Sequence, residues 1–402
     1  MDPLKLDQDR GREKGGVMPM AADASGRELD AGRLRIAMIG SRGLPLVYGG
    51  IERHVAEIGS RLAQRGHEIT VFGRRPFSAG GEHRGMRIRV LPSIPTKNLE
   101  TASNTLAAAL RALLEPFDVV HFHGVGPSIF SWITAARGMT TVATIHAGDY
   151  RQSKWGPAAR ALLRLGEKTA VRRTHAAIAV SRIMAAELEA RYGRPVVYIP
   201  NGADLREVPP FGAAGALGLE SGRYILAVGR FIVERGFHTL LEAFKNVPTE
   251  YRLVIAGDAR FEENYERRLK RMADPRVVFP GYVSGVLLDE LYAHCAFYVL
   301  PSTVEGLPIS LLEAMSFSRP VLVSDIPENL EVSGGIALTF ARENAADLSL
   351  ALARMLAMDE AERRRLGAAA RERVASRYTW DRVTDEVEAL YRRLVNARRD
   401  AH

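Results

Sequence analysis

The sequence of 402 residues has little of what several protein classes require. Its single cysteine, Cys295, cannot form an internal disulfide, and its apolar surroundings "AHCAFYVL" predict a core position. No apolar run approaches the ~20 residues needed to span a bilayer. Residues 1–33 are polar and mixed in charge, without the apolar segment of a secretory signal, and predict a disordered tail. Together these absences favour a cytoplasmic protein.

The charge balance restricts the partners that we expect. The net charge is +8, with 47% apolar and 25% charged residues, the profile of a globular protein. An arginine-rich composition alone explains such an excess, and so does an anionic substrate or membrane surface. Nucleic acid is not an expected partner, because no binding module is recognisable and aromatic residues do not alternate with basic ones.

The chain is too long for one ordinary core, and it divides into two halves with the same succession of predicted elements. In both halves, short apolar runs alternate with helical patterns, which predicts parallel strands buried on both faces. The predicted strands of the first half cover residues 34–40, 67–73, 86–92, 118–124, 140–146, 175–181 and 196–202. Those of the second half cover residues 224–230, 251–258, 276–283, 296–302 and 320–325. The fold class is therefore α/β, with two doubly wound Rossmann-like domains facing across a cleft.

The join between the halves is rich in Gly, Pro and Ala and predicts a linker. The resulting division has a tail, an N-terminal domain, a linker, a C-terminal domain and a terminal amphipathic helix, over residues 1–33, 34–203, 204–222, 223–377 and 378–396. Ligands of open α/β sheets bind beyond the carboxyl ends of the strands, so residues just after strands are the candidates for function.

The stretch "VEGLPISLLEAM" (304–315) holds two carboxylates eight positions apart, Glu305 in a strand-to-helix loop and Glu313 in the helix. Pro308 marks the helix start near Ile309, and the N–H groups of residues 307–310 form an anion site suited to a diphosphate. Gly306 lets the backbone approach a ligand. Carboxylates accept hydrogen bonds from vicinal hydroxyls, so this pair could hold a sugar on one side and a ribose on the other.

Four motifs resemble those of one family. "EGLPISLLEAM" is similar to the E-x7-E motif of retaining GT-B glycosyltransferases, most closely family 4. "AVGRFIVERGFHTLLEAF" (227–244) resembles their V-G-R donor motif, "GSRGLPLVYGGIERHV" (40–55) their N-terminal Gly-Gly loop, and "RYTWDRVTDEVEALY" their closing helix, which returns to the N-terminal domain. Segments such as "VVHFHGVGPSIFSW" resemble a bacterial branch that builds cell-surface polysaccharides and includes rhamnosyltransferases.

The resemblance implies a role for each matching residue. Glu305 holds hydroxyls of the transferred sugar, Glu313 holds the ribose hydroxyls, and His146 contacts the donor as a catalytic histidine. Tyr282 and Val283 read the base through their backbone. The diphosphate is bound by side chains or backbone groups of Arg230, Arg235, Gly49, Gly50, Gly306 and Leu307. Arg235 departs from the family pattern, which has Lys there; a guanidinium keeps the charge but is longer and planar.

No metal or other cofactor is expected. The only D-x-D, at residues 7–9, lies in the predicted tail, and arginines with a helix start can meet the charge of a leaving diphosphate. His121 and His123 alternate on one strand and face the same side. Metal binding by this pair would need a third ligand, which the sequence does not reveal, so a structural or cleft-lining role is favoured.

The expected donor is a nucleotide sugar, and the expected acceptor is a carbohydrate or a lipid-linked sugar. Asp149 and Lys154 are candidates for the acceptor side. A basic stripe at every fourth position is either a solvated helix face or a contact with an anionic membrane at the inner face of the plasma membrane: Arg160, Arg164, Lys168 and Arg172. A nucleotide-sugar epimerase of the same architecture and a non-catalytic sugar-nucleotide-binding protein remain alternatives.

Overall fold

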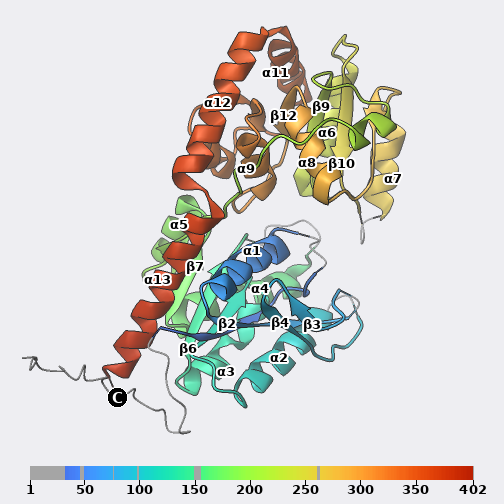
Figure 1. Cartoon of the computed structure of the whole chain (residues 1–402). Helices are drawn as coiled ribbons and strands as arrows, with labels where there is room; N and C mark the ends of the chain where they lie inside the picture. The colour runs from blue at the N-terminus through green and yellow to red at the C-terminus, as the bar shows by residue number, and fades with distance from the viewer. Residues whose placement is uncertain are drawn as a thin grey trace, which may run out of the picture.

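The computed structural model describes residues 32–45, 49–75, 77–96, 99–148, 155–259 and 263–401. Figure 1 shows two α/β domains, with the chain passing from the N-terminal domain to the C-terminal domain and back along a final helix. The predicted tail lies outside the described residues up to position 31. The predicted fold class, two Rossmann-like domains, is confirmed.

The N-terminal domain is built on an eight-stranded sheet in the order β3-β4-β2-β1-β5-β6-β7-β8. All neighbouring strands are parallel except the edge pair β3 and β4. The sequence did not predict this hairpin, which turns at Arg84 and Gly85, both with positive φ. The strands are β1 (Arg35–Ile39), β2 (Glu68–Gly73), β3 (Gly81–His83), β4 (Met86–Val90), β5 (Val119–His123), β6 (Thr140–Ile145), β7 (Ala176–Ala179) and β8 (Val197–Tyr198).

Helices cover both faces of this sheet, as the apolar strands require. They are α1 (Gly50–Gln64), α2 (Glu100–Ala112), η1 (Pro127–Phe130), α3 (Ser131–Ala136), α4 (Pro157–Arg173) and α5 (Arg182–Tyr192). The central strands β5 and β6 are fully buried along their length, including His121 and His123 of β5.

The C-terminal domain has a six-stranded, all-parallel sheet in the order β11-β10-β9-β12-β13-β14. Its strands are β9 (Tyr224–Val228), β10 (Arg252–Ala256), β11 (Val277–Val278), β12 (Phe297–Leu300), β13 (Val321–Ser324) and β14 (Leu338–Phe340). Its helices are η3 (Ala213–Leu217), η4 (Val233–Arg235), α6 (Phe237–Lys245), α7 (Glu263–Met272), α8 (Gly285–His294), α9 (Ile309–Ser316), α10 (Pro327–Ser333), α11 (Ala345–Ala357) and α12 (Glu360–Arg377). Cys295 is fully buried in this core, as predicted.

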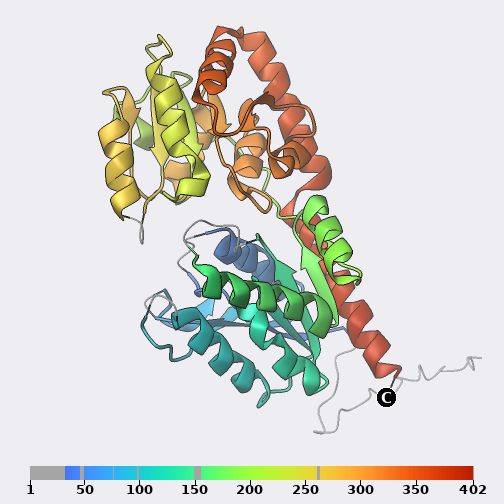
Figure 2. The same ribbon diagram turned by 180° about the vertical axis from the view of Figure 1, so that it is seen from behind.

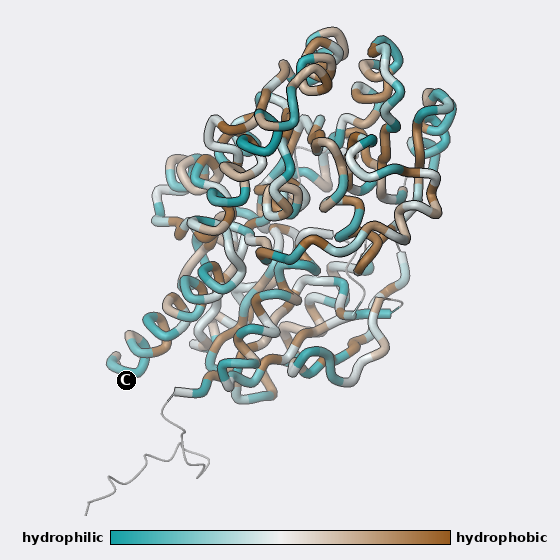
Figure 3. Tube along the Cα trace, turned by 45° about the horizontal axis from the view of Figure 1, so that its top comes forward, coloured by the Kyte–Doolittle hydropathy of each residue, from teal (hydrophilic) through white to brown (hydrophobic). Residues whose placement is uncertain are grey.

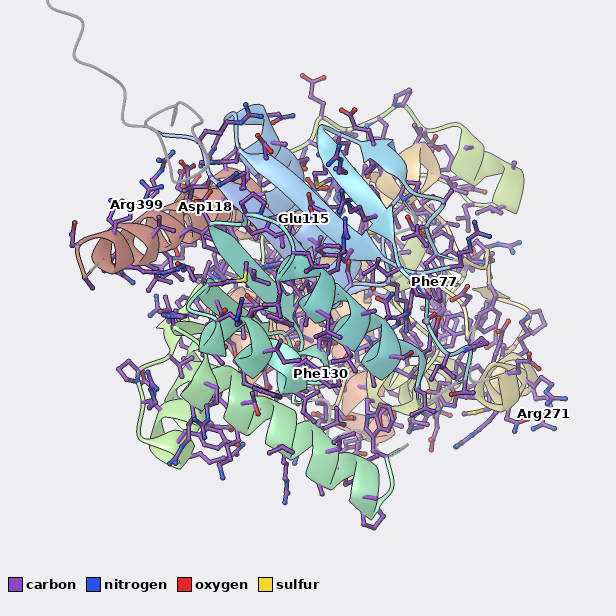
Figure 4. The ribbon with its side chains drawn as sticks, turned by 90° about the horizontal axis from the view of Figure 1, so that it is seen from below. Phe77, Glu115, Asp118, Phe130, Arg271 and Arg399 are labelled. Carbon is purple, nitrogen blue, oxygen red and sulfur yellow. The ribbon has the colours of Figure 1, made fainter. Side chains whose placement is uncertain are left out.

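The last helix, α13 (Trp380–Arg399), packs on the N-terminal domain. It alternates between hydrophobic and hydrophilic residues along its length (Figure 3). Its apolar face joins the core that α1 forms with the N-terminal sheet, through Trp380, Val383, Val387, Leu390, Tyr391 and Val395. At its far end, the Arg399 guanidinium is 4.0 Å from the carboxylate of Asp118, just before β5 (Figure 4).

The chain therefore crosses between the domains twice, and the two crossings touch. Ala203 pairs with Thr379 in a short parallel bridge, in which the Ala203 N–H donates to the Tyr378 carbonyl at 2.8 Å. A Cβ added to Gly202 would lie 2.8 Å from the backbone nitrogen of Trp380, so only glycine permits this approach.

Candidate functional site

The loop between β12 and α9 carries the first predicted carboxylate, Glu305, which is 8% exposed. Its carboxylate accepts a hydrogen bond from the guanidinium of Arg235, at the end of η4. The backbone N–H of Thr303 donates to the Glu234 carbonyl at 2.8 Å, so this loop and the loop after β9 are tied together. The structure thus pairs Arg235 with Glu305, a contact that the sequence did not predict.

Gly306 lies against the other domain. A Cβ placed on it would be 1.7 Å from the backbone carbonyl oxygen of His146, which follows β6. No side chain fits at this distance, so the close approach of the two domains itself requires glycine here. Gly306 was predicted to give a ligand access to the backbone, and the structure adds the contact with His146 as a second reason for glycine.

Two helix starts face each other between the domains. Helix α9 begins at Ile309 after Pro308, as predicted, and α1 begins at Gly50 after Gly49. A Cβ on Gly50 would lie 3.7 Å from the side chain of Ile309, which shows how near the two starts are. Because unpaired N–H groups and the positive ends of both helix dipoles meet in this space, it favours an anion.

Glu313 lies one turn into α9, also as predicted, and is held by two side chains. The Tyr292 hydroxyl donates to its Oε2 at 3.2 Å, and a guanidinium nitrogen of Arg53 is 3.6 Å from its Oε1. Burial raises the pKa of Glu313, while the charges of Arg53 and Arg206 oppose that rise. Arg53 belongs to α1, so this ion pair crosses between the domains.

His146 belongs to a wall of four histidines in the N-terminal domain. Its ring centroid is 4.6 Å from that of His54 and 5.7 Å from that of His123, and its Nε2 lies 3.4 Å from His123 Nδ1. His121 and His123 face the same side, as predicted, with ring centroids 4.0 Å apart. His121 is fixed at both nitrogens, by the Tyr391 hydroxyl at 2.5 Å and the Thr144 hydroxyl at 2.7 Å.

Asn201 connects the histidine wall to the loop between β12 and α9, called the donor loop below. Its Nδ2 donates to the Leu307 carbonyl at 2.9 Å, and its Oδ1 accepts from His54 Nδ1 at 2.9 Å. All three partners are buried. The two hydrogen bonds therefore link the loop that carries Glu305 to the ring that packs against His146.

Burial keeps the histidine wall neutral. It lowers the pKa of His54 from 6.5 to about 4 and the pKa values of His121, His123 and His146 well below 6.5. Near neutral pH these rings act as hydrogen-bonding groups without charge.

The remaining donor-side candidates follow the strands of the C-terminal sheet. Arg230 is half-buried just beyond β9. The Gly257 N–H, after β10, donates to the Gly281 carbonyl at 2.8 Å, which places the loop of Tyr282 and Val283 at the same edge of the sheet. Tyr282 is 45% exposed, and Val283 packs partly on the core.

The predicted basic stripe lies on α4, where all four of its residues are exposed. Leu162 and Leu165 are half exposed on the same helix, and Trp132 of α3 is 52% exposed nearby. Trp132, Leu165, Arg172 and Arg173 line a surface hollow of about 720 Å³. The acceptor candidates Asp149 and Lys154 lie outside the described residues.

Sequence reasoning missed three residues of the site: Arg53, His54 and Asn201. Arg53 and His54 lie one turn after the Gly-Gly pair, in "GGIERHV", and Asn201 ends "YIPNG" just before the linker. A polar residue one helical turn from a predicted ligand loop is the signal that could have found the first two.

Two family models match the chain in succession. The model described as Glycosyltransferase Family 4 matches residues 48–207, and the model described as Glycosyl transferases group 1 matches residues 216–373. The chain is 27% identical to a glycogen synthase of Mycobacterium tuberculosis, with 89% of this chain and 94% of that protein covered. It is 24% identical to O-antigen chain mannosyltransferase C of Escherichia coli, with 88% and 97% covered.

The fold is also that of known structures. Alr3699/HepE from Anabaena, crystallised with UDP and glucose, superposes with a TM-score of 0.73 at 18% identity, with 89% of this chain and 99% of that chain covered. Within the described residues, no helix is both long and apolar enough to cross a membrane.

Proposed function

Because the chain is a group 1 glycosyltransferase of the family 4 type with a GT-B fold, we propose that it transfers a sugar, with retention at the anomeric carbon, from a nucleoside diphosphate sugar to an acceptor hydroxyl. The product is a cell-surface polysaccharide or glycolipid. The UDP and glucose in the HepE structure support the donor class, and the O-antigen mannosyltransferase among the relatives supports the pathway class. The observation that carries the proposal is the meeting of two helix starts beside Glu305, Arg235 and His146.

The donor lies between the two domains in this proposal. Its diphosphate sits at the start of α9, within reach of backbone groups of Gly49, Gly50, Gly306 and Leu307 and of Arg230 and Arg235. Its ribose hydroxyls donate to Glu313, and its base lies on the loop of Tyr282 and Val283. Ion pairs hold Glu305 against Arg235 and Glu313 near Arg53, and carboxylate oxygens accept hydrogen bonds from sugar hydroxyls.

Fixed groups of the protein stabilise the charge separation in the transition state. A cation-like sugar and a departing diphosphate develop together, and cationic donors already aimed at the diphosphate stabilise that charge without reorganising. Arg235 donates a hydrogen bond to Glu305. Glu305, which binds the sugar hydroxyls, therefore also positions Arg235 for the leaving phosphate. With these cationic groups in place, the reaction needs no metal ion.

Retention requires attack from the face of the departing group. A carboxylate nucleophile would be one route, but Glu305 is committed to sugar hydroxyls and to Arg235. We therefore propose a same-face attack by the acceptor hydroxyl, with the leaving phosphate taking its proton. His146, neutral and packed against His54, supplies a hydrogen bond to the donor sugar.

The exposed face of α4 is proposed to hold the enzyme on the membrane that carries a lipid-linked acceptor. Figure 2 shows α4 on the outside of the N-terminal domain. Its four cations, with Leu162, Leu165 and Trp132 beside them, combine the charge and the apolar groups that an anionic lipid surface binds.

A donor screen tests the proposal. Binding to the folded protein raises its melting temperature, so a panel of UDP-, GDP- and dTDP-sugars should give one clear shift. Mass spectrometry of acceptor mixtures with that donor should then show a glycosylated product. An epimerised sugar without an acceptor would establish the epimerase alternative, and a shift with no turnover in any acceptor mixture would establish the non-catalytic binder.

A further inference from the structure

We propose that His54, His123 and His146 form a binding site for one divalent transition-metal ion that prefers imidazole, such as Zn²⁺. One ring nitrogen of each residue lies within 4.8 Å of the corresponding nitrogens of the other two. They come from α1, from β5 and from just after β6, so all three ligands belong to the N-terminal domain.

Two of the three rings carry a nitrogen that no group in the described chain satisfies. His54 is 1% exposed and His123 is fully buried, yet the Nε2 atoms of both lack a hydrogen-bond partner. Buried polar atoms are nearly always paired, so two neighbouring exceptions on nitrogen ligands point to an absent partner.

The hydrogen bonds around Asn201 set which nitrogen of His54 is free to bind, whereas the long 3.4 Å contact between His146 Nε2 and His123 Nδ1 would give way to an ion that takes His146 Nε2. Asn201 Nδ2 donates to the Leu307 carbonyl, so Asn201 Oδ1 must accept a hydrogen bond from the Nδ1–H of His54. His54 then has its lone pair on the unpartnered Nε2. This is the arrangement of metal-binding histidines, whose second nitrogen donates to an oxygen.

His121 is excluded from the site by the same reasoning, since both of its nitrogens are engaged by hydroxyl groups. Its role is to close the wall behind His123. Of the two histidines on strand β5, His121 therefore has a structural role and His123 is a metal ligand.

The donor set selects the kind of ion. Three imidazoles suit Zn²⁺, Cu²⁺ or Ni²⁺, whereas Mg²⁺ and Ca²⁺ prefer oxygen ligands. His146 is the most exposed of the three, so a fourth ligand, water or an anion, enters from the side of the donor loop.

The consequence for activity rests on the proposed function. An ion bound to His146 removes the nitrogen that would contact the donor sugar, so metal loading inhibits transfer. The site is then an inhibitory site of a reaction that itself needs no metal.

Metal titration of the full-length protein tests the site without reference to activity. After treatment with EDTA, one equivalent of Co²⁺ should give the visible absorption of a four-coordinate ion, and Zn²⁺ should displace it. X-ray absorption of the Zn²⁺ form should show three imidazole nitrogens at about 2.0–2.1 Å. The absence of stoichiometric binding, or a shell of oxygen ligands only, would overturn the proposal.

Variants locate the site. His54→Ala and His123→Ala should each weaken Co²⁺ binding by more than roughly tenfold, and Asn201→Ala by roughly tenfold to a hundredfold, because it supports a ligand. His238→Ala, on α6 of the other domain, is the matched control and should bind as the wild type does. Equal binding by all variants would place the ion elsewhere. If a His variant does not fold, the absorption spectrum of the wild type still decides.

Activity is a separate readout. One equivalent of Zn²⁺ should inhibit transfer, and EDTA should restore it. Loss of all transfer activity in the metal-free protein would contradict the proposed function and leave the metal site standing. Stoichiometric Zn²⁺ binding that leaves transfer unaffected would instead overturn the inhibitory role.

Discussion

The N-terminal wall of the site consists of neutral histidines, whereas the C-terminal wall consists of carboxylates held by arginines. In the first, burial removes charge from His54, His121, His123 and His146. In the second, each carboxylate is paired with a guanidinium, Glu305 with Arg235 and Glu313 with Arg53 of α1. In the proposed function, the C-terminal domain supplies most of the fixed charge near the diphosphate, Arg53 and the start of α1 add to it from the N-terminal domain, and the histidines of that domain are uncharged groups at the sugar.

The charged wall should be the more sensitive of the two. Glu305→Ala should lower kcat by roughly 10²–10³-fold, the cost of losing one preorganised transition-state group. It also leaves Arg235 without its carboxylate. Steady-state kinetics with the donor identified by the screen measures the loss. Glu266→Ala, which removes a surface carboxylate paired with Lys270, is the control. Wild-type turnover of the Glu305 variant would remove that residue from the mechanism.

A substitution at Gly306 should break the close contact between this glycine and the His146 carbonyl, where the two domains meet. Gly306→Ala places a methyl group in the His146 carbonyl, so the domains must separate locally. A misplacement of this size can cost roughly 10²-fold in rate. We expect that loss with a larger radius of gyration by small-angle scattering. Gly156→Ala, at a negative φ with open space around the Cβ, should change neither quantity. Full activity of the Gly306 variant would mean that this contact is absent from the working state.

Because the histidine wall is neutral in the folded protein, the free energy of unfolding should decrease as the pH falls. His54 has a folded pKa of about 4 against 6.5 unfolded, so the unfolded chain binds its proton first as the pH falls. Stability is complete above pH 6.5 and declines toward pH 4, by about 3 kcal/mol for this group. Urea unfolding from pH 7 to pH 4 measures the slope, and His54→Asn should make it shallower, since His121, His123 and His146 still contribute. A slope unchanged by that substitution would show that His54 is not a source of the decline.

The smallest effect is expected outside both walls, on α4. Reversing Arg164 and Lys168 to Glu should weaken binding to anionic vesicles, at about 1 kcal/mol for each charge near the surface. Turnover of a water-soluble acceptor should stay unchanged, since the helix face lies outside the donor site. Vesicle flotation measures the effect, with Arg354→Glu plus Arg365→Glu on the other domain as the control. Equal flotation of both double variants would leave the stripe as a solvated face.

The sequence predicted the parts of the site that local patterns determine. The start of α9 at Ile309, the position of Glu313 one turn later and the shared face of His121 and His123 follow from helix and strand periodicity, and the structure confirms them. The roles of Glu305, Arg230 and His146 stay predictions, because no ligand contact tests them.

The sequence could not predict what arises only when distant segments meet. His54 and Asn201 are 147 residues apart in the chain and hydrogen-bonded in the structure. Arg53 and Glu313 belong to different domains, and nothing in either segment indicates the other. The pairing of Arg235 with Glu305 also depends on two loops that only the C-terminal sheet brings together.

The return of α13 to the N-terminal sheet has a consequence for how the protein is made. Trp380, Val387 and Tyr391 fill a core whose members outside α13, from Leu34 to Ile199, leave the ribosome at least 181 residues earlier (380 − 199). The first domain to be synthesised is thus the last to be completed, and until the C-terminus emerges its apolar surface around α1 stays open to chaperones or to aggregation. A fragment that stops before residue 380 inherits that exposed surface permanently.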